Sequence, residues 1–196
     1  AFLVTRLSKN AWLDPAYMLA LGNQTDLTHG DMLSYFAALP GIETLGIYIE
    51  GFKDLDGLAF AKAVRKAVLN GKQIVVYKSG RTAPGQGGVM GHTASIAGGL
   101  TLFESVVRHA GAIVAEDFNS FDDLFYIAGV LQGKKIGGRR IGAISGAGFE
   151  AVGMADNIES DSFALEMGAL EEATVKKVED ILVAKKLDQL VEVRNP

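Results

Sequence analysis

The sequence predicts an α/β protein built from two doubly wound domains, each with a parallel sheet and helices on both faces. Short β-branched runs alternate along the chain with segments of helical periodicity, and this order favours parallel strands joined by right-handed crossovers. Hydrophobic residues make up 48% of the 196 residues, and 24 glycines accompany only 4 prolines. That composition is typical of a packed α/β protein with many tight turns between strands and helices.

We expect the first domain to occupy residues 1–105. Its expected elements are an amino-terminal helical piece, a strand at 17–21, a helix at 31–39, a strand at 45–49, a helix at 58–69, a strand at 73–77, a glycine-rich loop over 80–91 and a helix over 100–110. In the helix at 58–69, Leu58, Ala61 and Val64 share one face, and Gly71 is a candidate C-cap.

The second domain is expected at residues 106–196. Its expected elements are a strand at 112–115, a helix capped by Ser120 and running to 131, a loop at 133–138, a strand at 140–145, a helix at 149–159 and a last helix at 170–186. Glu172 near the start of the last helix and Lys185 near its end complement the helix dipole.

Composition and charge exclude several classes of function. The net charge is -4 and no sustained cationic cluster is present, which argues against nucleic-acid binding. The absence of cysteine excludes disulfides, thiol catalysis and thiolate metal sites. No apolar run approaches the ~20 residues of a membrane span, and the first residues lack a cleavage signal, so we expect a cytoplasmic protein. The sequence contains no cluster of carboxylates at the spacing of metal ligands, so we expect no metal site in this chain.

Chemistry is expected at His92, which lies in the glycine-rich segment TAPGQGGVMGHTASIAGG at 82–99. The backbone N–H groups of a slim loop can converge on an anion, and an imidazole among such donors can carry a phosphoryl group covalently. A lone histidine is more often a surface or hydrogen-bonded core residue, and that alternative remains open on the residues alone. His29 and His109 are expected to face solvent without a role.

Two further features are compatible with the same chemistry. Glu50 follows the strand at 45–49 and should share one rim of the sheet with His92, where a carboxylate can hold one imidazole nitrogen as a donor. It can equally be a solvated turn residue. Gly146, Ala147 and Gly148 stand between a strand and a helix, where the exposed N–H groups favour a bound phosphate. Such turns also serve close packing of a helix on a sheet.

The segments TAP, MGH and IAGG resemble the phosphohistidine segment of the succinyl-CoA synthetase α subunit. The segment KSGRTA and the HT after Gly91 resemble the single-chain NDP-forming acyl-CoA synthetases. The chain is identified as a member of the superfamily of NDP-forming acyl-CoA synthetases and as a fragment of one. Two positions depart from the pattern: the single-chain enzymes usually have SHTG where this chain has GHTA. Ala94 in place of glycine makes the backbone stiffer just after His92.

The resemblance implies roles for individual residues. The segment IYIEGF at 47–52 is similar to family segments in which a glutamate orients the histidine, which implies that Glu50 does so. The resemblance further implies phosphate contacts from Gly91 and Thr93. The turn at 146–148 resembles the NGAG turn of the succinyl-CoA synthetase β subunit, and this implies that all three of its residues contact phosphate.

The fold and activity implied by the resemblance are those of a larger enzyme. Two flavodoxin-like or Rossmann-like domains would be present, the second similar to the carboxyl-terminal part of the β subunit. The enzyme would interconvert acyl-CoA, NDP and phosphate with a carboxylic acid, CoA and NTP, through an acyl phosphate and a phosphohistidine. CoA and ATP or GTP with Mg²⁺ would bind mainly to a CoA-binding domain and an ATP-grasp domain or subunit outside this chain. The complete enzyme is expected to be an oligomer, and the fragment alone inactive.

Two rival readings belong to other classes. The same domains also occur as regulatory regions without turnover, for example attached to protein acetyltransferases. A flavodoxin-like domain that binds FMN is a third possibility, but no hydroxyl-rich phosphate loop follows an early strand.

Overall fold

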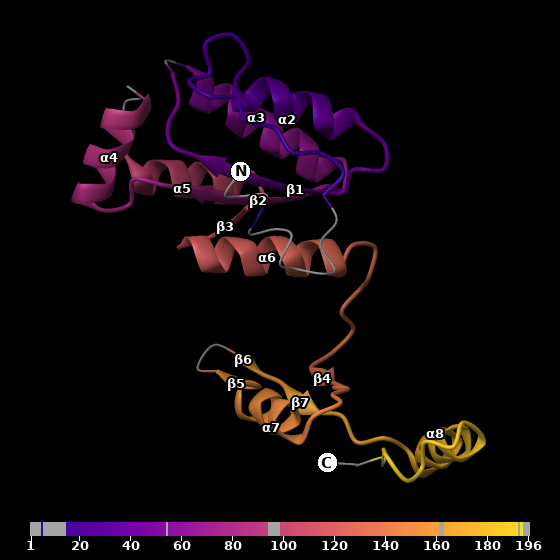
Figure 1. Ribbon diagram of the computed structural model, residues 1–196. Helices are drawn as coiled ribbons and strands as arrows, with labels where there is room; N and C mark the ends of the chain where they lie inside the picture. The colour runs from indigo at the N-terminus through magenta and orange to yellow at the C-terminus, as the bar shows by residue number, and fades with distance from the viewer. Residues whose placement is uncertain are drawn as a thin grey trace. The chain divides into compact units, whose positions relative to one another are not determined.

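The computed structural model of the chain describes residues 5, 15–53, 55–93, 99–160, 163–191 and 193. It divides into two compact units, residues 1–134 and 135–196 (Figure 1). The first unit contains α2 (His29–Ala38), β1 (Thr44–Ile49), α3 (Asp56–Leu69), β2 (Gln73–Lys78), α4 (Ala83–Thr93), α5 (Leu100–His109), β3 (Ile113–Val114) and α6 (Phe118–Val130).

A parallel sheet of strand order β1-β2-β3 forms the centre of the first unit. Thr44 pairs with Gln73 and Ile49 with Lys78, so β1 and β2 are paired along their whole length without a bulge or a shift in register. Parallel pairing was predicted for these strands and is confirmed. Because the strands point the same way, the segments that follow them meet at one edge of the sheet.

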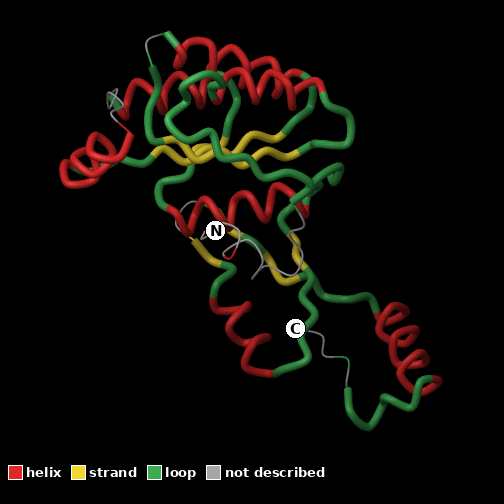
Figure 2. Tube along the Cα trace, turned by 45° about the horizontal axis from the view of Figure 1, so that its top comes forward, coloured by secondary structure: helices red, strands yellow, loops and turns green. Residues whose placement is uncertain are grey.

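Helices cover both faces of this sheet, with α2 and α3 above it and α6 below it in the view of Figure 1, and Figure 2 shows the same layers from another angle. Alternate side chains of β2 serve the two faces. Ile74 and Val76 are buried in a cluster with residues of α2, α3 and α5. Val75 is buried with Phe121 and Ala128 of α6. The sheet is therefore packed on both sides, as the doubly wound prediction required.

Side-chain caps fix where two of the helices begin. The Thr28 hydroxyl accepts a hydrogen bond from the Asp31 backbone N–H at 3.2 Å, and the Asp31 carboxylate accepts one from the Thr28 N–H, a capping box that starts α2. In α6 the cap is Asp117, whose carboxylate accepts from the Ser120 N–H at 2.8 Å. Ser120, predicted as the cap, is instead the third helical residue and completes the box from that position.

The strand predicted at 17–21 is absent. Tyr17, Met18 and Leu19 are exposed and irregular, and no described strand pairs with them. A strand needs a neighbour for its backbone hydrogen bonds, and an apolar sequence alone does not supply one. The Tyr17 ring packs against Phe36 of α2 instead, with ring centroids 5.3 Å apart.

The first unit extends beyond the boundary predicted at residue 105. Strand β3 pairs with β2, and α6 packs across β1 and β2, so residues 106–134 complete this sheet and one of its faces. The Phe125 ring lies so close to Gly46 that a Cβ there would come within 2.9 Å of it. Strand–turn–helix order alone did not reveal to which sheet β3 belongs.

The second unit contains β4 (Arg140–Ile141), α7 (Gly148–Asp156), β5 (Glu159–Ser160), β6 (Phe163–Ala164), β7 (Glu166–Met167) and α8 (Glu172–Ala184). Strand β4 pairs in parallel with β7, and β5 pairs antiparallel with β6. The strand predicted over 140–145 is thus only two residues long, whereas both predicted helices are present with shorter bounds. Neither α7 nor α8 has a buried residue among those described.

We predict that Gly111→Ala lowers the free energy of unfolding by about 2–3 kcal/mol, whereas Gly71→Ala lowers it by about 1 kcal/mol. Both glycines have positive φ, of 103° and 82°, which strains an alanine. Only at Gly111 would the new Cβ also meet a neighbour, since Val68 Cγ1 lies 2.8 Å away. Urea unfolding followed by circular dichroism measures both losses. Equal losses would show that the contact with Val68 is relaxed at no cost.

Candidate active site

A pocket of about 590 Å³ opens at the carboxyl edge of the sheet in the first unit. It is lined by Tyr48, Glu50, Tyr77, Ser79, Gly80, Arg81, Thr82, Gly85, Gly88 and Glu116. These residues lie near the ends of β1 and β2, follow β1, β2 or β3, or belong to the first half of α4. Ligands of proteins with parallel α/β sheets bind at this edge. The sequence predicted that Glu50 lies at this edge, and it is among the residues that line the pocket.

Glu50 is half-buried and held by hydrogen bonds at both its carboxylate and its backbone. The Tyr48 hydroxyl, from near the end of β1, donates to Glu50 Oε1 at 3.1 Å. Lys78 Nζ donates to the Glu50 carbonyl oxygen at 3.2 Å. Burial raises the pKa of the Tyr48 hydroxyl, so it remains a hydrogen-bond donor to the carboxylate. These contacts distinguish Glu50 from a turn residue whose side chain is surrounded by solvent.

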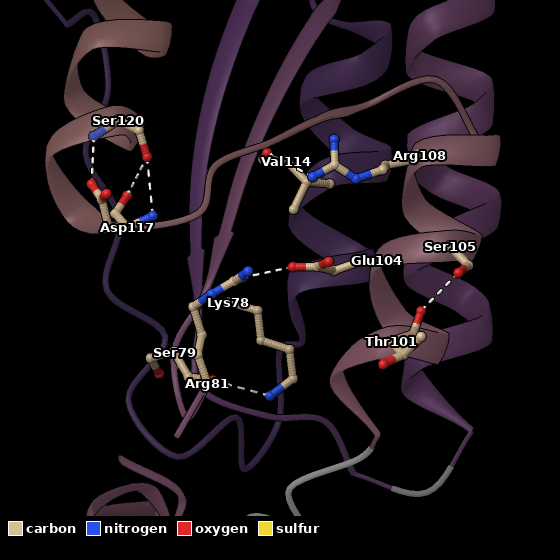
Figure 3. Close-up of polar contacts among 10 residues, drawn as sticks. All are labelled: Lys78, Ser79, Arg81, Thr101, Glu104, Ser105, Arg108, Val114, Asp117 and Ser120. Atoms are coloured by element: carbon tan, nitrogen blue, oxygen red, sulfur yellow. Dashed lines mark hydrogen bonds and ion pairs between the residues drawn. The ribbon is translucent and has the colours of Figure 1, made fainter. Parts of the chain in front are cut away.

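A fixed cation lies at the edge of the pocket. Arg81 forms an ion pair with Glu104 of α5 at 2.7 Å (Figure 3), with both side chains mostly buried. Asp117 is also nearby: its pKa is lowered chiefly by the backbone hydrogen bond from Ser120 and, to a smaller extent, by the charge of Arg81. Held in this way, the guanidinium can favour an anion in the pocket without being reoriented.

The segment predicted as a loop before His92 forms helix α4, and Gly91, His92 and Thr93 belong to its end. Thr82 explains the start, because its hydroxyl accepts a hydrogen bond from the Gly85 N–H at 3.2 Å and its carbonyl accepts one from the Gln86 N–H at 2.8 Å. Proline in the first turn, at position 84, is compatible with a helix because its missing N–H is not needed there. The glycines of this segment therefore do not prevent it from forming a helix.

The first half of α4 contributes to the pocket through Gly85 and Gly88, which bring the helix backbone close without side chains. The side chains of His92 and Thr93, and all of Ala94, lie outside the described residues. The predicted contact between Glu50 and the imidazole therefore stays a prediction.

The turn at 146–148 begins α7 in the second unit, with Ala147 at the cap position. The Ala147 N–H donates to the Ser145 hydroxyl oxygen at 3.1 Å, and that hydroxyl donates to Glu150 Oε2 at 2.6 Å. A Cβ at Gly146 or Gly148 would meet no described atom within 4 Å. Close packing within the described residues thus does not account for these glycines, and a role in phosphate binding stays a prediction.

His29 differs from its prediction, because it is half-buried and hydrogen-bonded. Its Nδ1 lies 2.7 Å from Gln24 Oε1, and Gln24 Nε2 donates to the Gly51 carbonyl at 3.1 Å. The pair is thereby connected to the backbone of Gly51, the residue directly after Glu50. Burial lowers the pKa of His29, and a hydrogen bond with the Tyr48 carbonyl opposes that shift. His109 is exposed, as predicted.

Several pocket residues were not identified from the sequence as site residues, namely Tyr48, Tyr77, Arg81 and Glu116. Their common signal is position, because each ends or follows a strand of one parallel sheet. For Arg81 a second signal was present, since the segment KSGR at the end of β2 carries two cations. Among the described residues, no group of three or more metal-ligating side chains could hold a metal ion. No helix among the residues that the structure describes is long and apolar enough to cross a bilayer.

Comparison with known proteins shows what the chain resembles. The family described as the succinyl-CoA ligase-like flavodoxin domain matches residues 1–131. The ADP-forming acetate–CoA ligase of Methanocaldococcus jannaschii is 32% identical over 181 residues, covering 88% of this chain and 25% of that protein. The alpha subunit of ADP-forming acetate–CoA ligase II of Pyrococcus furiosus is 29% identical over 178 residues, covering 91% of this chain and 36% of that protein.

A solved structure agrees with these matches. The dinucleotide-forming acetyl-coenzyme A synthetase 1 of Ca. Korarchaeum cryptofilum, in complex with phosphate and ADP, superposes with a TM-score of 0.61 at 27% identity. The match covers 83% of this chain and 34% of that one. The chain thus spans between a quarter and about a third of the length of these relatives.

We predict that acidification from pH 8 to pH 5.5 destabilises the protein partly through His29. Because the folded pKa is below the unfolded value, the unfolded chain binds a proton that the fold resists, and stability falls as the pH drops through about 6.5. Urea unfolding of His29→Gln at both pH values should show a smaller loss than the wild type. The exposed His109 provides the control, since His109→Gln should keep the wild-type dependence; an unchanged loss in His29→Gln would contradict the assignment.

Proposed function

Because the chain belongs to the family of succinyl-CoA ligase-like flavodoxin domains and to the superfamily of NDP-forming acyl-CoA synthetases, we propose that it is the part of such an enzyme that carries a phosphoryl group on His92. The complete enzyme interconverts acyl-CoA, NDP and phosphate with a carboxylic acid, CoA and NTP. The observation that carries this proposal is the pocket that brings Glu50, Arg81 and the first half of α4 together at one edge of the sheet.

The chemistry proceeds in three steps that each move one group. A phosphate oxygen attacks the thioester carbonyl of acyl-CoA, and the CoA thiolate leaves as the acyl phosphate forms. A nitrogen of His92 then attacks phosphorus, and the carboxylate leaves. Finally, an oxygen of NDP attacks the phosphorus of phospho-His92, and the N–P bond breaks to regenerate the imidazole and form NTP.

The residues of this chain supply positioning and charge for these steps. Glu50 accepts a hydrogen bond from the second imidazole nitrogen and balances the cation that develops when the first nitrogen is phosphorylated. The Arg81 guanidinium at the pocket edge favours the anionic phosphoryl group. Gly91 and Thr93 contact the phosphate beside the histidine. The turn of Gly146, Ala147 and Gly148 offers backbone N–H groups to a phosphate at the start of α7.

Other domains complete the enzyme. A CoA-binding domain and an ATP-grasp domain or subunit, mainly outside this chain, bind CoA and the nucleotide with Mg²⁺. The second unit is the ligase-like α/β domain that follows the phosphohistidine domain; the parallel β4–β7 pair with α7 between its strands supports this assignment. One relative is itself a subunit alpha, consistent with an oligomer.

We predict that His92→Ala in the complete enzyme abolishes both the acid-labile phosphoenzyme and overall turnover while leaving folding nearly intact, because the nucleophile alone is lost. Glu50→Gln should slow turnover by the order of 10²-fold, since the imidazole keeps its reactive nitrogen but loses its fixed tautomer and the supporting charge. Incubation with ATP and Mg²⁺ followed by mass spectrometry of the phosphorylated peptide measures the first effect, and steady-state kinetics the second.

Two outcomes would overturn this assignment. Turnover that is unchanged in His92→Ala would exclude the phosphohistidine step. A wild-type protein that takes up no phosphate with every domain present would instead favour a regulatory region, such as one attached to a protein acetyltransferase, that binds acyl-CoA without turnover.

We predict that the chain by itself forms no acyl-CoA from carboxylic acid, CoA and ATP. The sites for CoA and the nucleotide belong to the other domains, so only weak binding of phosphate is expected here. A coupled assay for CoA consumption measures this, and adding the missing domains is the positive control. Steady turnover by the chain alone would show that the division of sites among the domains is wrong.

A further inference from the structure

We infer that Lys78 is a positioning residue for Glu50: its buried ammonium fixes the main chain of Glu50 while the Tyr48 hydroxyl fixes the carboxylate. The inference rests on the proposed role of Glu50 at the phosphohistidine and adds to it the residues that hold Glu50 in place.

Lys78 occupies an unusual place for a cation. It is the last residue of β2 and only 2% exposed. By the alternation of the strand it lies on the same face as Ile74 and Val76, which are buried in the apolar cluster under α2, α3 and α5. Burial lowers its pKa, and the nearby charge of Arg81 lowers it further. An ammonium at such a position costs free energy unless its contacts compensate.

Those contacts lie at the pocket. Nζ donates to the carbonyl oxygens of Glu50 at 3.2 Å and of Ser79 at 3.3 Å, so one ammonium joins the segments that follow β1 and β2. Figure 3 shows the Lys78 side chain folding back toward Ser79 and Arg81 at this end of the strand. The Ser79 N–H also donates to the Ile49 carbonyl at 2.9 Å. The main chain of Glu50 is therefore tied to β2.

Tyr48 acts on the other end of the same residue. Its hydroxyl donates to Glu50 Oε1, and its ring is packed against Tyr77 and Phe118, with centroids 5.9 and 5.7 Å away. A hydroxyl on a packed ring is a rigid donor, so the carboxylate has little freedom to rotate away. A displacement of about 1 Å in a catalytic group can cost about 10²-fold in rate.

A matched control lies at the other end of the same strand. Lys72, directly before β2, donates through Nζ to the carbonyl oxygens of Leu39 and Ile42. This is the same kind of contact, but at the amino end of the strand, about 20 Å from Lys78 for six extended residues. If such lysines serve only to connect segments of the fold, replacing either one should have the same consequences.

The test measures phosphorylation of His92 by acyl phosphate in single turnovers of the complete enzyme. Lys78→Met should slow this step by about 10- to 100-fold, with KM for the acyl substrate within about threefold of the wild type. Lys72→Met should leave the rate within about twofold. Equal rates in the two variants, measured on folded protein, would overturn the positioning role.

A double variant separates positioning from a general loss of structure. If Lys78 acts through Glu50, Lys78→Met combined with Glu50→Gln should be no slower than Glu50→Gln alone, because the group that Lys78 positions has already been disabled. Multiplying effects would overturn the inference. Should Lys78→Met fail to fold, Tyr48→Phe provides the same comparison, with an expected loss of about 3- to 10-fold that vanishes on the Glu50→Gln background. Tyr35→Phe, on the exposed side of α2, is its control.

The result also distinguishes failure of this inference from failure of the proposed function. A wild-type rate in Lys78→Met beside a slow Glu50→Gln would remove the positioning role and leave the phosphohistidine intact. No phosphorylation of the wild type, or phosphorylation that persists in His92→Ala, would overturn both.

Discussion

The parallel pairing of β2 with a strand on each side is the constraint on which the rest of the first unit depends. It aligns the ends of β1 and β2 residue by residue, so Glu50 and Ser79 emerge next to each other. It also buries both faces of β2, and so requires helices above and below. The pocket exists because the segments that follow three strands leave one sheet edge together. The charges there are held by fixed contacts, since Tyr48 and Lys78 hold Glu50 and Glu104 holds Arg81.

Much of the first unit could be predicted because its signals are local. Runs such as QIVVY and the apolar face of α3 carry their own periodicity, and the element bounds differ by only a few residues. The errors arose where the deciding contact is remote. Residues 17–21 have a strand-like composition but no strand partner, α4 forms despite its glycines because of Thr82, and β3 joins the first sheet by pairing with β2.

The site shows the same division. The position of Glu50 after a strand was readable, and the structure confirms it at the carboxyl edge. Two other contacts could not be predicted. The Lys78 ammonium donates to the Glu50 carbonyl, 28 residues earlier, and His29 contacts Gln24, five residues earlier. Contacts of this kind leave no periodic pattern in a single sequence. The polar residues around His29 predicted an exposed side chain. Gln24, which has a φ of 53°, instead places its amide within hydrogen-bonding distance of the imidazole.

Strand β1 forms the border of the sheet among the described residues, where β2 is its one strand partner. Its sequence TLGIYI contains no charge and no proline, the devices that usually keep sheet borders from joining. The Tyr48 carbonyl interacts with His29, and no described strand pairs with the outer side of β1. A border of this kind favours pairing with a further strand. A lysine at Gly46 would not prevent such pairing without disturbing the core, because the Phe125 ring occupies the space of its Cβ.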